Sequence, residues 1–340
     1  MIAFKRTKMI FVTGGTGLVG SNLLLHLVDK GEKVRALKRS NSNVREVEKF
    51  FKRNKSQEIF HKIEWIEGDI LDITFLPTAL KDVKTIFHTA AYVSFNPKDE
   101  DHIIHTNVDG TEALVNEAID SGVENFVYVS SIAAMDDINP VTKLIDEKST
   151  WNNDAKHSAY AISKYCSEME VWRGSQEGLN VIVVNPSVII GSFDGKRESE
   201  KLFQDNFINT YAPTGGTGFV DVRDVVKIIV DLYDKKLFNQ KFILNSENLN
   251  YSNVLSYIGK KKQKEINSIS NKTLKTLQIV TSVTKYFGTP ALDKGTYQAL
   301  TTFTKYDNSK IINTLDYTFI PVTESIDYHY KNYQEVISSK

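Results

Sequence analysis

The chain contains a single cysteine, Cys166, among 340 residues. No disulfide can therefore form within the chain, which fits a reducing compartment. No apolar run approaches the roughly 18 residues that a membrane helix needs, and residues 1–8 lack the apolar stretch of a signal peptide. From these absences we expect a cytoplasmic protein that is not stably inserted in a membrane.

An excess of either charge is also lacking. Lysine plus arginine and aspartate plus glutamate each total 42, so the formal net charge is zero. This balance argues against a general nucleic-acid-binding surface. A content of 41% hydrophobic and 25% charged residues is that of an ordinary globular protein. The length allows about two domains or one large α/β unit.

Short β-rich runs alternate with helical patterns through the first half. Residues 9–13 predict a buried strand, residues 18–30 a helix, and residues 103–121 are also helical in pattern, closed by Gly122. This alternation predicts an α/β fold, a Rossmann-type doubly wound parallel sheet. We expect the dinucleotide-binding domain over 1–185 plus 219–244. A smaller, discontinuous C-terminal substrate lobe is expected over 186–218 plus 245–340.

The strongest local signal is TGGTGLVG at 13–20, between the first predicted strand and helix. Gly14 allows a tight turn, Gly17 lets the backbone approach a pyrophosphate, and Gly20 lets the helix pack closely on the sheet. Thr16 and Leu18 complete the predicted contacts of this loop with a dinucleotide. The alternative is a plain glycine-rich turn.

The residues after the second strand bear on the choice of cofactor. In the NAD pattern an acidic residue there binds the ribose 2′-hydroxyl, but here Lys38 and Arg39 follow and the first acid is Glu46. Arg39 could pair with a 2′-phosphate, helped by Lys38 or Arg45. We therefore favour NADP(H) over NAD(H), and the alternative is a solvated basic turn.

Tyr160 and Lys164 are spaced i, i+4, so on a helix they share one face. A neighbouring cation favours a phenolate, so Lys164 is predicted to lower the pKa of Tyr160 and fit it for proton transfer. Ser130 and Ser131 follow the fifth predicted strand, where a hydroxyl could bond the reacting oxygen. The sequence does not separate the two serines, and strand-end capping is the alternative for both.

Together these motifs resemble the extended branch of the short-chain dehydrogenase/reductase superfamily, the epimerase/dehydratase-like proteins. The resemblance runs from about residue 8 to 245 and is carried by eight segments. They are TGGTGLVG (13–20), GDILD (68–72), HTAA (88–91), TNVDGT (106–111), YVSSIAA (128–134), YAISK (160–164), NPSVIIG (185–191) and FVDVRDV (219–225). Within the branch, the chain looks most like dihydroflavonol reductases and 3-beta-hydroxysteroid dehydrogenases.

The resemblance implies site residues. Ser131, Tyr160 and Lys164 would be the catalytic triad, and Lys164 would also bond the nicotinamide ribose. The remaining cofactor contacts would come from positions along the strand ends, and Asn107 would support the active-site helix. These cofactor residues are Asp69 and Ile70 beside the adenine, His88 and Ala90 along the cofactor channel, and Pro186 near the nicotinamide. Asn185 stands where many relatives have arginine.

We therefore expect an NAD(P)H-dependent oxidoreductase acting on a small carbonyl or alcohol. One alternative is a sugar-nucleotide epimerase or dehydratase with tightly bound NAD, and another is a nucleotide-binding regulatory protein without turnover. No metal site is expected, because His102 and His105 lack a clear third ligand. The resemblance allows a homodimer formed through the helix that carries Tyr160.

The stretch 260–285 is locally basic, with seven lysines and one glutamate. It also carries apolar residues at near-helical spacing. Three interpretations remain open: a lid over an apolar substrate, a transient membrane contact, or a plain surface helix with a core-facing stripe.

Overall fold

The computed structural model describes residues 8–94, 96–196, 198–204, 211–276 and 294–338. The chain divides into two compact units. The first comprises residues 1–135, 159–186 and 222–242, and the second comprises 136–158, 187–221 and 243–340. Residues 136–158 therefore group with the second unit, whereas the sequence-based boundaries assigned them to the first.

The first unit is built on a seven-stranded sheet of order β10-β6-β5-β4-β1-β2-β3, in which the neighbours from β6 to β3 pair in parallel. This confirms the predicted Rossmann-type fold. Its strands are β1 (Met9–Thr13), β2 (Val34–Lys38), β3 (Ile63–Glu67), β4 (Val83–His88), β5 (Asn125–Val129), β6 (Asn180–Pro186) and β10 (Gln240–Leu244).

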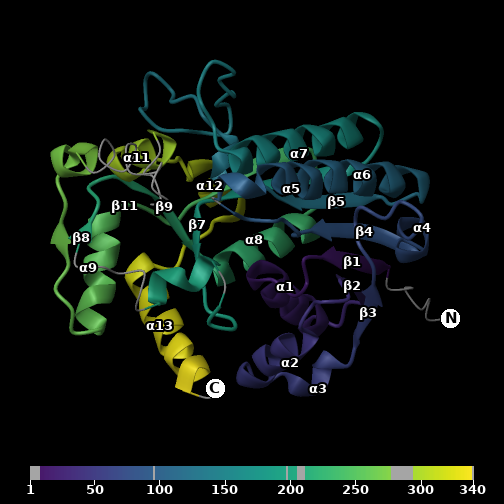
Figure 1. Ribbon diagram of the computed structural model, residues 1–340. Helices are drawn as coiled ribbons and strands as arrows, with labels where there is room; N and C mark the ends of the chain where they lie inside the picture. The colour runs from purple at the N-terminus through teal and green to yellow at the C-terminus, as the bar shows by residue number, and fades with distance from the viewer. Residues whose placement is uncertain (1–7, 95, 197, 205–210, 277–293, 339–340) are drawn as a thin grey trace. The chain divides into compact units, whose positions relative to one another are not determined.

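Helices cover both faces of this sheet. Figure 1 shows α5, α6 and α7 together over one face, and α1 and α8 over the other. The main helices are α1 (Leu18–Asp29), α2 (Val44–Arg53), α5 (Glu100–Ile104), α6 (Gly110–Asp120), α7 (Ala159–Gln176) and α8 (Val222–Asp234). The shorter ones are α3 (Gln57–Phe60), α4 (Leu76–Ala79), and the 3-10 turns η1 (Pro97–Asp99) and η3 (Ile132–Ala134).

Burial on both faces explains why the central strands read as continuous apolar runs. Every residue of β5 is buried, and Phe126 and Val127 are fully so. The core on the side of α6 and α7 includes Phe126, Tyr128 and Val183 from the strands and Val115 and Val171 from the helices. Parallel strands enclosed in this way need apolar side chains pointing both ways.

The helical pattern predicted over 103–121 is confirmed, with an irregularity that the pattern did not show. A π-helical turn, η2 (His105–Asp109), separates α5 from α6. Within it, the Asn107 side chain accepts from the Tyr92 backbone N–H at 2.7 Å and donates to Ser163 Oγ at 3.0 Å. A π-bulge inserts an extra residue into the helix and re-aims its side chains, and here it turns Asn107 towards α7.

The second unit contains a three-stranded sheet of order β11-β9-β7 and a two-stranded parallel pair of β8 and β12. Its strands are β7 (Val188–Ile190), β8 (Tyr211–Ala212), β9 (Gly216–Asp221), β11 (Glu247–Asn250) and β12 (Asn267–Ser268). Its helices are η4 (Glu198–Phe203), α9 (Tyr251–Lys261), α11 (Lys294–Thr301), α12 (Ser309–Leu315) and α13 (Val322–Ser338). Phe203, Phe219, Ile258 and Ile326 lie at the centre of its core.

Among the described residues, no helix combines the length and apolar character that crossing a membrane requires.

Candidate active site

The glycine loop after β1 has the geometry predicted for it. Gly14 adopts φ +71°, a left-handed conformation that favours glycine, and a Cβ there would lie 2.6 Å from the Ala90 backbone nitrogen. The Gly17 N–H donates to the Gly14 carbonyl at 2.8 Å and closes the turn. A Cβ on Gly20 would lie only 2.1 Å from that carbonyl oxygen, so α1 packs directly against the loop.

The start of α1 suits a bound pyrophosphate. Gly17 is the N-cap, no side chain among the described residues caps the helix, and the first turn contains no acidic residue. Its N–H groups and the positive end of the helix dipole are therefore available to an anion. A Cβ on Gly17 would meet only the Gly14 oxygen, at 3.2 Å, so the loop leaves space for a phosphate to approach the backbone. These residues fit a dinucleotide cofactor.

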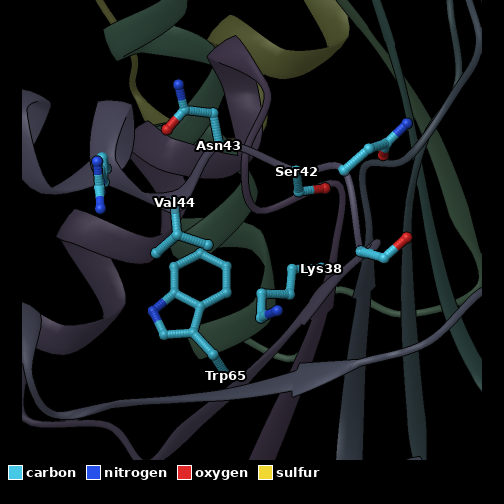
Figure 2. A pocket seen from close by; sticks show the side chains of 8 residues that line it. Lys38, Ser42, Asn43, Val44 and Trp65 are labelled. Atoms are coloured by element: carbon cyan, nitrogen blue, oxygen red, sulfur yellow. The ribbon is translucent and has the colours of Figure 1, made fainter.

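An open groove of about 620 Å³ lies at the C-terminal end of β2. Its lining residues are Lys38, Ser40, Asn41, Ser42, Asn43, Val44, Arg45 and Trp65. Figure 2 shows Val44, Trp65 and Lys38 among the side chains that line this groove. The lining includes two cations and no carboxylate, so the groove favours an anionic ligand.

The cations at this groove differ in their partners. Lys38 forms an ion pair with Glu67 of the neighbouring strand. Arg45 lines the groove and its side chain is exposed. Arg39 is exposed but is not a lining residue, and its backbone N–H donates to Ser42 Oγ at 3.0 Å. Arg45, which the sequence analysis gave only a helping role, is therefore better placed in the groove than Arg39.

The remaining predicted cofactor residues lie along the strand ends. Asp69 accepts from the Leu71 N–H at 3.0 Å, which fixes the turn after β3. Ile70 is 6% exposed and belongs to the hydrophobic core. Ala90 lies beside Gly14, and its N–H donates to Thr13 Oγ1 at 3.3 Å. Pro186 is the buried last residue of β6.

His88 occupies the interior rather than a channel wall. It is 1% exposed, with Nδ1 at 2.6 Å from Thr13 Oγ1 and Nε2 at 3.0 Å from Thr111 Oγ1. Its ring stacks on Tyr128 at a centroid distance of 5.4 Å. Burial, with a smaller contribution from Lys164, lowers the pKa of His88 to about 3. His88 is therefore a neutral structural residue that links β1, β4 and α6.

The two serines after β5 have different partners. Ser130 is 5% exposed and donates to Glu168 Oε2 at 2.8 Å. Ser131 keeps partial exposure, accepts from the Ala133 N–H at 3.1 Å, and hydrogen-bonds Tyr160. The two serines therefore differ in their partners: Ser131 hydrogen-bonds the phenol of Tyr160, and Ser130 hydrogen-bonds the carboxylate of Glu168.

Lys164 lies one helical turn after Tyr160 on α7 and is almost fully buried. Its Nζ donates to the Val129 carbonyl at 2.7 Å and lies 4.6 Å from the centre of the Tyr128 ring. Burial lowers its pKa to about 7, while the charge of Glu168 acts in the opposite direction. Near neutrality the lysine therefore exists in both protonation states.

The predicted acidic phenol is not found. Burial raises the pKa of Tyr160, and the hydrogen bond with Ser131 only partly opposes this rise. Burial also disfavours the charged form of Lys164. Desolvation disfavours every charged form, and here it outweighs the attraction that i, i+4 spacing suggests.

The sequence did not indicate two residues, Glu168 and Ser163, whose hydrogen bonds connect elements of the candidate site. Glu168 is 2% exposed and accepts from both Ser130 and Asn185. Ser163 hydrogen-bonds Asn107 and so joins α7 to the π-helical turn. The signal for Glu168 was its spacing, one further turn beyond Lys164 on the same face of α7.

No cluster of three or more potential metal ligands occurs among the described residues. His105 pairs with Asp109 at 2.6 Å, and the ring of His102 packs against Tyr92 at 4.5 Å. Of the basic stretch 260–285, residues 277–285 lie outside the described residues. Within the described part, Lys261 forms an ion pair with Asp327 at 2.8 Å, and Leu274 is 5% exposed.

Comparison with curated proteins gives relatives of several activities. The chain is 31% identical to a Synechocystis protein that carries the name dihydroflavonol 4-reductase. The match spans 255 residues and covers 73% of this chain and 71% of the relative. It is 31% identical over 251 residues to the sterol demethylase protein B of Methylococcus capsulatus, covering 73% and 72%. A 3 beta-hydroxysteroid dehydrogenase/isomerase of Mycobacterium tuberculosis is 29% identical over 57% of this chain and 50% of its own length.

Solved structures share the fold over nearly the whole chain. Gox2253 superimposes with a TM-score of 0.81 at 25% identity, covering 96% of this chain and 98% of that one. The yeast methylglyoxal/isovaleraldehyde reductase Gre2, solved with NADPH, gives 0.73 at 21% identity, covering 97% and 99%. A family model, that of the NAD dependent epimerase/dehydratase family, matches residues 10–242. The chain therefore belongs to the NAD dependent epimerase/dehydratase family, whose members bind a nicotinamide cofactor.

Proposed function

We propose that the protein is an NADPH-dependent carbonyl reductase that interconverts a ketone or aldehyde and the corresponding alcohol through Ser131, Tyr160 and Lys164. The observation that carries this proposal is the hydrogen-bonded pair of Ser131 and Tyr160 at the C-terminal end of β5, with Lys164 one helical turn beyond. Family membership and relatives named as reductases and a dehydrogenase support it.

A bound NADPH supplies a hydride from its nicotinamide ring. As the substrate oxygen gains negative charge, the Tyr160 hydroxyl donates its proton to that oxygen, and the Ser131 hydroxyl donates a hydrogen bond to it. The raised pKa of Tyr160 supports the direction of reduction, because a phenol that stays protonated near neutrality is a proton donor. The same property disfavours the tyrosinate base that an epimerase would need.

Lys164 would stabilise the phenolate that remains after this proton transfer. Its Nζ is fixed by the Val129 carbonyl and by the Tyr128 ring, so little reorganisation is needed at that moment. Proton transfer of this kind typically contributes 10²- to 10⁴-fold to the rate.

The proposed preference for NADPH rests on the groove at the end of β2. Arg45 lines that groove, and Arg39 follows the lining residue Lys38 in the sequence. The lining contains no carboxylate that could accept a hydrogen bond from a ribose 2′-hydroxyl. A planar guanidinium pairs well with a phosphate. We propose that the glycine loop with Thr16 and Leu18 holds the pyrophosphate, while Asp69 and the Ile70 backbone border the adenine.

The test compares wild type with Tyr160→Phe. NADPH oxidation would be followed with methylglyoxal, isovaleraldehyde, a dihydroflavonol, cinnamoyl-CoA and a 3-ketosteroid. We expect stoichiometric NADPH consumption by wild type on at least one carbonyl, and a loss of kcat by at least about 10²-fold in Tyr160→Phe. NADPH affinity, measured by fluorescence titration, should stay within about threefold.

Other outcomes would contradict the proposal. Near-normal turnover by Tyr160→Phe would remove the tyrosine from the reaction. Purification with tightly bound NAD and turnover without added cofactor would favour the sugar-nucleotide epimerase or dehydratase. NADPH binding without turnover on any of the carbonyls would favour a nucleotide-binding regulatory protein.

A further inference from the structure

The carboxylate of Glu168 is buried within the first unit, behind the proposed catalytic residues. Its side chain is 3% exposed. Oε2 accepts from Ser130 Oγ at 2.8 Å and from Asn185 Nδ2 at 2.9 Å. Oε1 accepts from Trp172 Nε1 at 3.3 Å and lies 3.5 Å from Lys241 Nζ. All of these partners donate, so the arrangement suits a carboxylate that is ionised and fully engaged.

These contacts connect Glu168 to the ends of two central strands. Ser130 immediately precedes Ser131 at the end of β5, and Asn185 is the penultimate residue of β6. The Asn185 amide also donates to the Ser131 carbonyl at 2.9 Å. One carboxylate therefore fixes the backbone on both sides of Ser131, which hydrogen-bonds Tyr160.

Glu168 also acts on Lys164. The two side chains are one helical turn apart on α7 and share its buried face. The titratable groups around Lys164 and Glu168 come from β4, β5, β10 and α7: His88, Tyr128, Lys241 and Tyr160. His88 is neutral and Tyr128 is un-ionised, because burial lowers the pKa of the first and raises that of the second. Glu168 is thus the negative charge that supports the ammonium of Lys164.

We propose that Glu168 is a positioning residue of the active site. It holds Ser131 in place through Ser130 and Asn185, and its negative charge stabilises the ammonium form of Lys164. The proposal rests on the function proposed above, since it gives Ser131 and Lys164 the same roles.

The first test measures kcat and KM for carbonyl reduction between pH 5.5 and 9.5 in wild type and Glu168→Gln. Removing the negative charge lowers the pKa of Lys164 further, so the alkaline limb of kcat should move to lower pH by about one unit. One unit corresponds to about tenfold less charged lysine on that limb. We expect kcat at pH 8 to fall about tenfold and to recover towards wild type near pH 6. KM for NADPH should change by less than about threefold.

Glu170→Gln is the matched control. Glu170 is on the same helix and is also paired, with Arg173 at 2.9 Å, but its side chain is 27% exposed. Its pH profile should overlay that of wild type. A fall in kcat by the same factor at every pH in Glu168→Gln, with no shift of the limb, would overturn the role in charging Lys164.

Ser130→Ala separates positioning from charge, and it serves equally if Glu168→Gln does not fold. It removes one hydrogen bond that links Glu168 to β5 and leaves the carboxylate in place. We expect kcat to fall several-fold at every pH without a shift of the alkaline limb. A kcat equal to that of wild type would overturn the positioning role.

A second readout needs neither substrate nor cofactor. Above the folded-state pKa of Lys164 the folded protein loses a proton that the unfolded chain keeps, so stability to urea should rise with pH. This rise should begin about one pH unit lower in Glu168→Gln than in wild type and Glu170→Gln. A coincident onset would overturn the proposal even if no carbonyl is reduced, whereas a shifted onset would support it even if the proposed reaction fails.

Discussion

At the scale of single residues, desolvation dominates the chemistry of the candidate site. Tyr160 and Lys164 have their pKa values moved away from the charged forms, the first upward and the second down to about 7. The phenol therefore stays protonated near neutrality, which suits a tyrosine that gives up a proton only to a developing alkoxide. Among these buried groups, Glu168 is a carboxylate whose contacts are all with donors: Ser130, Asn185, Trp172 and Lys241.

The first prediction concerns selectivity for NADPH over NADH. Arg45 lines the groove at the end of β2, and Arg39 follows that strand directly. A lost charge-assisted hydrogen bond to a 2′-phosphate costs about 1.5–3 kcal/mol, or roughly 10- to 150-fold in affinity. Arg45→Ala should weaken NADPH by that factor and leave NADH within about twofold, and Arg39→Ala should act in the same direction but less.

Titration of both cofactors by nicotinamide fluorescence measures this. Lys52→Ala is a suitable control, because Lys52 is an exposed cation near the end of α2. An equal loss of NADPH and NADH affinity in Arg45→Ala would contradict a contact with the 2′-phosphate.

The motifs predicted where the site side chains lie in the fold, but not how deeply they are buried. The spacing of Tyr160 and Lys164 correctly placed both side chains on α7, since helical periodicity is a local property. The pKa of Tyr160 was predicted to fall and burial instead raises it, and the His88 ring was placed in a channel rather than the interior. Both errors have one cause: the cost of burying a charge depends on neighbours that are distant in sequence.

At the scale of elements, the turn between β1 and α1 is the most constrained part of the candidate cofactor site. Because Gly20 touches the backbone of Gly14, neither the helix nor the loop can move without the other. The pattern of glycines therefore predicts both the turn and the position of the helix N-terminus. The same reasoning did not find the π-helical turn η2, since its cause is the contact of Asn107 with Tyr92 and Ser163.

The second prediction follows from this close packing. Gly20→Ala would bring a Cβ to 2.1 Å from the Gly14 oxygen, a backbone atom that cannot rotate away. Overpacking of this kind typically costs about 1–3 kcal/mol of stability. Displacement of the loop should also weaken NADPH binding by at least about tenfold, as measured by urea unfolding and fluorescence titration.

Gly31 provides the control for that experiment. It also adopts a positive φ, +79°, but a Cβ there would meet nothing within 4 Å. Asparagine tolerates this conformation, so Gly31→Asn should bind NADPH as wild type does. If Gly20→Ala binds as tightly as Gly31→Asn, the loop is not the pyrophosphate site.

At the scale of the whole molecule, the predicted doubly wound fold is confirmed, because it depends on the repeated alternation of buried strands and helices. The short strands β7 and β11 were not predicted, since three or four residues carry too little periodicity to be recognised. The folding stability of the first unit should depend on pH through the protonation of His88. Its imidazole joins Thr13 of β1 to Thr111 of α6, so protonating it would break contacts between a strand and a helix.

The third prediction is a loss of stability in mild acid that depends on His88. Its pKa is about 3 in the folded protein, against 6.5 in the unfolded chain. As the pH falls below 6.5, this histidine binds a proton in the unfolded chain but not in the folded protein, so folding stability decreases. Between pH 7 and pH 5 this single group should lower the free energy of unfolding by about 2 kcal/mol.

His88→Gln should be less stable than wild type at pH 7, because its amide replaces the ring contacts imperfectly. Its free energy of unfolding should nevertheless fall less steeply as the pH is lowered. Urea unfolding at pH 5, 6 and 7 measures both slopes, with the exposed His61→Gln as a control that should follow wild type. Parallel slopes for wild type and His88→Gln would mean that the pKa of His88 does not change on folding, and would contradict the prediction.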